Sequence, residues 1–160
     1  MKTAQNWIQE LELSPHPEGG YYKEVYRSEE ELVGELLPGD RSGIRSVSTA
    51  IYFLLEGNDF SAFHRIKSDE IWHFYAGDSL IIYTIDENGL LTEYPLNSDV
   101  PMQIIPRNNW FAAELKEKDS YALVGCTVAP GFDFEDFEMG SQEDLIKEFP
   151  KHSDLIKQLS

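Results

Sequence analysis

"FHRIKSDEIWHFYAGD", at residues 63–78, is the stretch of this 160-residue chain that decides its fold. Two runs rich in aromatic and β-branched residues flank the polar turn KSD, which is typical of two consecutive strands. Alternate side chains of a strand point to the same face, so Glu70, Trp72 and Phe74 share one face of the second strand. If the apolar faces point inward, His64 and Glu70 project into the same interior beside Trp72.

The chain from Ser46 onward repeats this pattern of short strand-like runs separated by turns. The runs are SVSTAIYFLL, FSAFHRI, EIWHFYA, SLIIYTID, LLTEYPL, MQIIP, NWFAAELK and YALVGCTVAP. Many short strands at nearly even spacing favour a sandwich or barrel over βαβ units. We therefore predict one all-β domain over residues 1–160 with a barrel core at about 46–139. A helix and loop at 1–45 precede the core, and helices at 141–160 follow it.

Acidic residues outnumber basic residues by 29 to 13, which gives a net charge of −16. Such a charge repels phosphate backbones and anionic lipid headgroups, so we expect neither nucleic acid nor a membrane as a partner. Cys126 is the only cysteine, which excludes an intrachain disulfide and a cysteine zinc cluster. No apolar run approaches membrane length and the first residues lack a signal-peptide core, so we expect a cytoplasmic protein.

Two further segments are each open to two interpretations. SPHPEGGYY, at residues 14–22, is predicted to be a loop because it combines two prolines with two glycines. This loop either covers the barrel mouth and supplies Glu18 or Tyr22 to a ligand, or is a structured turn before the first strand. GFDFEDFEM, at residues 131–139, is either a flap that faces the ligand or an edge strand with one buried face.

Five segments in order resemble one protein family. They are HPEGGYYKEVYRS, STAIYFLL, HRIKSDEIWHFYAGD, NWFAAEL and GCTVAPGFDFEDFEM, and they extend over most of the chain. Together they resemble the uncharacterised, domain-of-unknown-function branch of the RmlC-like jelly-roll cupins. The resemblance implies a double-stranded jelly-roll barrel with a central cavity, usually a homodimer, and no agreed activity.

The metal-ligand pattern of cupins is only half present. In metal-binding cupins the first motif carries two histidines and a glutamate, and the second motif adds a histidine. The resemblance places His64 and Glu70 at two of these four positions, whereas Ile66 and Phe111 occupy the other two. One imidazole and one carboxylate hold a divalent metal only with several waters or further ligands. We expect no cofactor, and we disfavour a divalent metal, which His64 and Glu70 would hold if it bound.

Aromatic residues take the place of the missing ligands. Trp72, Phe74, Trp110 and Phe111 are candidates for the cavity wall, although neighbours Trp110 and Phe111 cannot both face inward on a regular strand. These rings are either core or part of a site for a small molecule. We predict the latter, a site for a flat or ring-shaped molecule such as a sugar or heterocycle. Its predicted residues are His64, Glu70, Trp72, Phe74, Trp110, Phe111, Glu18 and Tyr22.

Two enzyme functions are alternatives to simple binding. A metal-independent isomerase or epimerase acting on a sugar-like substrate would use His64 as general base, oriented by a carboxylate such as Glu70, and Tyr22 as proton donor. A metal-dependent cupin enzyme is disfavoured by Ile66 and Phe111. A jelly roll also leaves strand edges that need cover, so we expect a homodimer in which outward-facing His73 and Tyr75 are interface residues.

Overall fold

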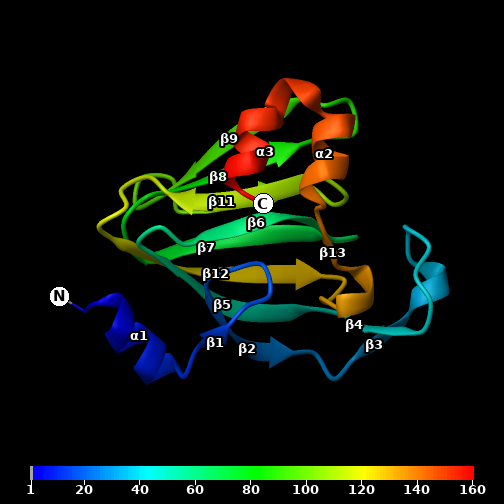
Figure 1. Ribbon diagram of the computed structural model, residues 1–160. Helices are drawn as coiled ribbons and strands as arrows, with labels where there is room; N and C mark the ends of the chain where they lie inside the picture. The colour runs from blue at the N-terminus through cyan, green and yellow to red at the C-terminus, as the bar shows by residue number, and fades with distance from the viewer. Residues whose placement is uncertain (1) are drawn as a thin grey trace.

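Two antiparallel sheets face one another in the computed structural model, which describes residues 2–160 (Figure 1). The larger sheet has the strand order β1 (Ser14–Pro15), β2 (Tyr21–Arg27), β5 (Thr49–Glu56), β12 (Tyr121–Ala129), β7 (Asp69–Gly77) and β10 (Met102–Ile105). The smaller sheet has the order β13 (Glu138–Met139), β6 (Phe60–Arg65), β11 (Trp110–Leu115), β8 (Leu80–Ile85) and β9 (Leu91–Leu96). The predicted all-β jelly roll with short terminal helices is confirmed.

The main core lies between the sheets because each strand turns alternate apolar side chains inward. Phe53, Leu55, Leu80, Ile82 and Phe111 belong to this cluster and are almost completely buried. A bulge in the pairing of β12 with β7, between Leu123 and Val124, shifts the register near the end of β7. This register shift lies near Gly77, at the opposite end of β7 from Glu70.

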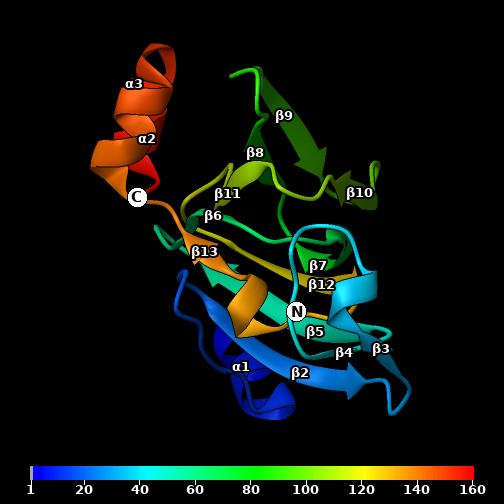
Figure 2. The ribbon, with the colours of Figure 1, turned by 90° about the vertical axis from the view of Figure 1, so that its right-hand side faces the viewer.

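Helices cover the outer face of each sheet (Figure 2). Helix α1 (Ala4–Leu11) is capped by Thr3 and packs with Leu54 and Leu123 on the outer side of the six-stranded sheet. Helices α2 (Gln142–Glu148) and α3 (Ser153–Gln158) cover the five-stranded sheet, with the short 3₁₀ turn η3 (Pro150–His152) between them. No helix of residues 2–160 is long and apolar enough to cross a membrane.

A small two-stranded sheet between β2 and β5 holds the segment after β12 in place. It consists of β3 (Glu31–Val33), the 3₁₀ turn η1 (Gly34–Leu36) and β4 (Ile44–Ser46). From β4, the buried Arg45 donates two hydrogen bonds to Asp136, from Nε at 2.9 Å and from Nη2 at 3.0 Å. Asp136 lies in the 3₁₀ turn η2 (Phe134–Asp136), so this ion pair fixes the residues beside the barrel opening.

Candidate functional site

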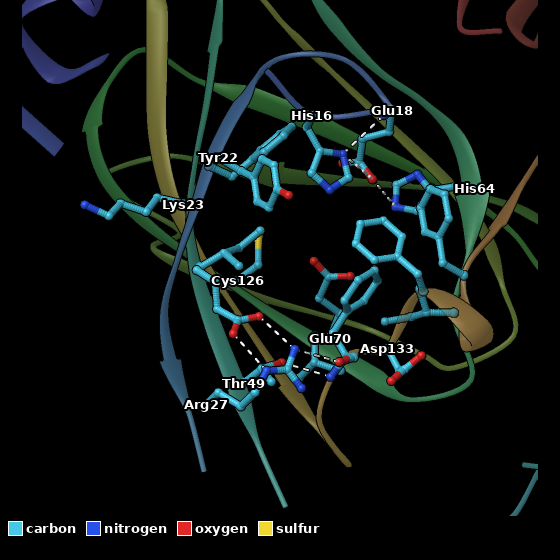
Figure 3. A pocket seen from close by; sticks show the side chains of 18 of the residues that line it. His16, Glu18, Tyr22, Lys23, Arg27, Thr49, His64, Glu70, Cys126 and Asp133 are labelled. Carbon is cyan, nitrogen blue, oxygen red and sulfur yellow. Dashed lines mark hydrogen bonds and ion pairs between the residues drawn. The ribbon is translucent and has the colours of Figure 1, made fainter. Parts of the chain in front are cut away.

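A cavity of about 450 Å³ lies between the inner face of the six-stranded sheet, β6 and the segment around η2 (Figure 3). Its apolar walls are formed by Ile51, Phe53, Ile66, Val128, Phe132 and Phe137. Its buried polar lining includes His16, Glu18, His64, Glu70 and the thiol of Cys126, and Tyr22 faces it from β2. Charged residues Lys23, Glu24, Arg27 and Asp133 surround the opening.

The loop between β1 and β2 carries Glu18 into this cavity. Gly19 makes the entry possible because it has a φ of +108° and because a Cβ there would lie 2.1 Å from the carbonyl oxygen of Phe60. The Glu18 carboxylate lies 2.9 Å from Nε2 of His64 and accepts a hydrogen bond of 2.8 Å from the Ser61 hydroxyl. Burial raises the pKa of Glu18, but the adjacent charge and hydrogen bond of His64 outweigh this and lower it.

Both ring nitrogens of His64 are engaged by acceptors. Nδ1 lies 2.7 Å from the carbonyl oxygen of Ala62, and Nε2 faces the Glu18 carboxylate. Burial lowers the pKa of His64, but the carboxylate of Glu18 outweighs burial and raises it. His64 is therefore an imidazolium paired with Glu18, and neither of its nitrogens is free to take a proton from a ligand.

His16 has one free nitrogen. Its Nδ1 accepts a hydrogen bond of 3.2 Å from the backbone N–H of Glu18, and its ring lies edge-on to Tyr22 with centroids 4.4 Å apart. Burial lowers the pKa of His16 and favours the neutral ring, and the hydrogen bond that Nδ1 accepts leaves the proton of that ring on Nε2. In Figure 3 this second nitrogen points into the cavity, where it can donate a hydrogen bond.

Glu70 extends from the start of β7 to the centre of the cavity (Figure 3). The residue is 8% exposed, and its carboxylate forms no ion pair with any residue from 2 to 160. Burial and the negative charge of Glu18 raise the pKa of Glu70 to about 7, against the opposing charge of His64. Hydrogen bonding from the Cys126 thiol and the Trp72 indole lowers that pKa, but less than burial and Glu18 raise it.

A family model described as "Cupin superfamily (DUF985)" matches residues 5–140. The chain belongs to this family. A similar sequence is the uncharacterized protein YML079W of Saccharomyces cerevisiae, which is 30% identical and is matched over 91% of this chain and 79% of its own. The resemblance inferred from the five segments is therefore confirmed.

Solved structures of similar chains have the same fold. Protein SO0799 from Shewanella oneidensis is 40% identical, with a TM-score of 0.89 and coverage of 100% of this chain and 98% of its own. A hypothetical protein from Leishmania major is 33% identical, with a TM-score of 0.87 and coverage of 99% of both chains. Oxalate decarboxylase from Bacillus subtilis is 15% identical, with a TM-score of 0.56 over 91% of this chain and 37% of its own. This last likeness concerns the fold alone.

The cupin metal site is not reproduced by the residues of this cavity. Among residues 2–160, no group of three or more His, Cys, Asp and Glu side chains is arranged to hold a metal ion. Both nitrogens of His64 have other partners, Ile66 lines the cavity as hydrocarbon, and Phe111 lies against the His64 ring at 4.1 Å. The donor set therefore does not fit a metal.

Four of the eight site residues predicted from sequence line the cavity, namely Glu18, Tyr22, His64 and Glu70. The other four do not line it. Trp72 is 1% exposed and packs edge-on against Phe53 in the core, while Phe111 lies behind His64. Phe74 packs against the same core. Trp110 points to the opposite side of the sheet, toward α2 and α3, with the guanidinium of Arg65 4.4 Å from its ring centroid.

The sequence interpretation missed other residues of the cavity. His16 belongs to the HPEGG segment. A histidine close to two glycines in a predicted loop was the sequence signal that could have identified it as a cavity residue. Phe132 and Phe137 belong to the segment with two interpretations, which forms the turn η2 and only a two-residue strand, β13. The flap interpretation describes their position better than the edge-strand interpretation does, because both rings line the cavity.

Proposed function

We propose that this cupin binds a small, ring-containing organic molecule in the barrel cavity without the help of a metal ion. The observation that carries the proposal is Glu70, a buried carboxylate that has no cationic partner and points into the cavity. Burying such a charged group costs several kcal/mol in lost hydration unless a partner of opposite charge or a hydrogen-bond donor offsets it. The cavity volume of about 450 Å³ falls within the usual range of small-molecule sites.

The walls favour a flat ligand. Phe53, Phe132 and Phe137 present aromatic faces or edges to the cavity, and these pack well against rings. Three polar groups, the Tyr22 hydroxyl, His16 Nε2 and the Glu70 carboxylate, are available for hydrogen bonds. A few polar groups on an apolar surface are the usual composition of a site that orients one molecule.

A fragment screen by NMR tests this proposal. We expect at least one ring compound from a panel of sugars, sugar nucleotides and nitrogen heterocycles to bind saturably. It should shift the methyl signals of Ile51 and Val128 in the cavity and leave those of exposed Val33 unchanged. If no compound binds, or if saturable binders shift surface signals alone, the proposed function is wrong.

A metal-independent isomerase or epimerase is a second candidate function, and it is favoured by the Glu70 carboxyl group, whose pKa of about 7 suits proton transfer near neutrality. Because His64 is occupied by Glu18 and Ala62, we assign the role of general base to Glu70 rather than to His64. In the same screen, exchange of a carbon-bound hydrogen of a bound sugar for solvent deuterium would identify catalysis. Binding without exchange would leave the protein a binder.

We also propose that the protein is a cytoplasmic homodimer that associates through the outer face of the six-stranded sheet. Tyr75 on β7 and Met102 and Ile104 on the edge strand β10 are 53%, 52% and 52% exposed. Apolar side chains grouped beside an unpaired strand edge are typical of an association surface. Part-buried His73 lies opposite Met102 in the pairing of β7 with β10.

Light scattering at micromolar concentration tests the dimer. We expect twice the chain mass of 18.3 kDa, and we expect Ile104→Lys to shift the population toward the monomer because a charge on this face opposes association. Val33→Lys, which changes an exposed apolar residue on β3, serves as the control. A single species of 18.3 kDa for the wild-type protein contradicts the proposal.

A further inference from the structure

The charge balance of the cavity indicates which class of molecule it binds. Three cationic side chains belong to its lining, and each one already has a carboxylate partner. His64 pairs with Glu18 at 2.9 Å. Lys23 donates a hydrogen bond of 2.6 Å to Glu12, away from the cavity.

Arg27 is the third cation, and its guanidinium is also occupied. Its Nε and Nη2 each donate a hydrogen bond of 2.8 Å to the Glu24 carboxylate, and Nη2 also donates to the carbonyl oxygen of Phe132 at 3.1 Å. The lining therefore offers an anionic ligand no cation that lacks a carboxylate partner.

The acidic side chains of the lining are not balanced in the same way. They number four, Glu18, Glu24, Glu70 and Asp133, against the three cations. Asp133 accepts a hydrogen bond of 2.9 Å from the backbone N–H of Glu135 and so serves as the N-cap of η2. Glu70 forms no ion pair with any residue in the described range 2–160, although it is only 8% exposed. Because Lys23 pairs with Glu12 outside the lining, Asp133 and Glu70 are the two lining carboxylates without a cationic partner, and Glu70 is the buried one.

We propose that the ligand is an organic cation whose amino or amidino group donates hydrogen bonds to Glu70 and whose flat body packs between Phe53, Phe132 and Phe137. This inference rests on the proposed function, since it names the ligand class of the same cavity. A protonated nitrogen supplies both the opposite charge and the N–H donors that a buried carboxylate lacks.

The surroundings of Glu70 favour a cation over a neutral or anionic ring. Aromatic faces attract cations through the ring quadrupole, and this attraction is stronger in a cavity than in water. The net charge of −16 raises the local concentration of cations around the protein and lowers that of anions. Glu18, which lies in the same cavity, would repel a carboxylate or phosphate group of the ligand further.

Three test ligands of nearly the same shape differ mainly in charge, so a comparison of their affinities isolates the effect of ligand charge. Benzamidine carries a charge of about +1 at neutral pH, benzamide is neutral and benzoate carries about −1. Their binding to the full chain is measured by NMR titration of the cavity methyl signals at pH 8, where Glu70 is mostly ionised. We expect benzamidine to bind at least about tenfold tighter than benzamide, because a charge-assisted hydrogen bond is roughly twice as strong as a neutral one. Benzoate should bind most weakly.

Variants then assign the preference to one residue. Glu70→Gln keeps the shape of the side chain and removes its charge, so the advantage of benzamidine over benzamide should fall to less than about twofold. Glu93→Gln, at an exposed position on β9, removes the same charge outside the cavity and should keep the full preference. The ranking of the three molecules on the wild-type protein does not depend on how well any variant folds.

Several results would overturn the assignment of an organic cation. Benzamide or benzoate binding as tightly as benzamidine would do so while leaving the ligand-cavity proposal intact. A benzamidine preference that survives in Glu70→Gln would place the cation elsewhere. No saturable binding of any of the three also overturns the assignment, and the fragment screen then decides the fate of the cavity proposal separately.

Discussion

His64→Ala is expected to destabilise the protein by about 3–5 kcal/mol, which is a large part of the stability of a typical domain. The substitution leaves the Glu18 carboxylate in a buried site from which its charged partner has been removed. Ser61 supplies only a neutral hydrogen bond, and Nδ1 of His16 lies 3.6 Å from the Glu18 carboxylate, farther than Nε2 of His64 at 2.9 Å. The loss also includes the packing of the imidazole against Phe111, whose ring centroid lies 4.1 Å away.

Urea unfolding at pH 6 measures this effect. His152→Ala is a suitable control, because His152 makes a single hydrogen bond of 2.9 Å to the Gly89 carbonyl oxygen. Removing this hydrogen bond should lower the free energy of unfolding by only about 1 kcal/mol. The double variant Glu18→Gln with His64→Ala should recover at least about 1 kcal/mol of the sum of the single losses, because the two side chains are one unit. If His64→Ala lowers the free energy of unfolding by less than about 1 kcal/mol, the ion pair between His64 and Glu18 does not stabilise the fold as proposed.

The pair also sets a pH window for stability. The pKa of Glu18 is lowered in the folded protein, so its contribution is present above the ordinary value of 4.5 and is lost as pH falls through the folded value. The pKa of His64 is raised, so its contribution is present below 6.5 and is lost as pH rises through the folded value. The ion pair therefore stabilises most between these limits, which explains the choice of pH 6.

The sequence predicted the face on which a side chain lies better than its depth in the barrel. Alternation placed His64, Glu70 and Trp72 inward, and all three point between the sheets. Glu70 lines the cavity, however, whereas Trp72, two residues further along β7, is buried in the core cluster. A period of two carries no information about position along the strand axis.

Strand β11 illustrates a second limit. Alternation alone could not decide between Trp110 and Phe111, because all six residues of WFAAEL are buried. One face of this strand packs into the barrel and the other packs under α2 and α3. A strand that is covered on both sides has no polar face to orient it, so the choice depends on contacts with distant elements.

The loop residues were the least predictable part of the site. Glu18 reaches His64 only because the loop closes over Phe60, which is a contact between segments more than 40 residues apart. The cavity-lining turn η2 is fixed by Arg45 from across the chain, 91 residues before Asp136. Local patterns cannot specify such long-range pairs, even though they identified both segments as unusual.

Glu70→Gln should have the opposite effect to His64→Ala and stabilise the protein at pH 8. The pKa of Glu70 is raised from 4.5 to about 7 in the folded state, so the folded protein binds more protons than the unfolded chain between these values. Stability therefore decreases as pH rises through this window, by at most about 3 kcal/mol for one group. Glutamine resembles the protonated carboxyl group and removes the penalty.

Thermal and urea unfolding of wild type, Glu70→Gln and the surface control Glu93→Gln at pH 5 and pH 8 measure the difference. We expect a gain of about 2–3 kcal/mol for Glu70→Gln at pH 8 and less than about 1 kcal/mol at pH 5, where the wild-type carboxyl group is protonated in the folded state. Equal or lower stability at pH 8 would mean that the protein itself satisfies the carboxylate. If Glu70→Gln both stabilises the fold and removes the preference for the cation, the carboxylate serves ligand binding. Stability alone would favour the glutamine.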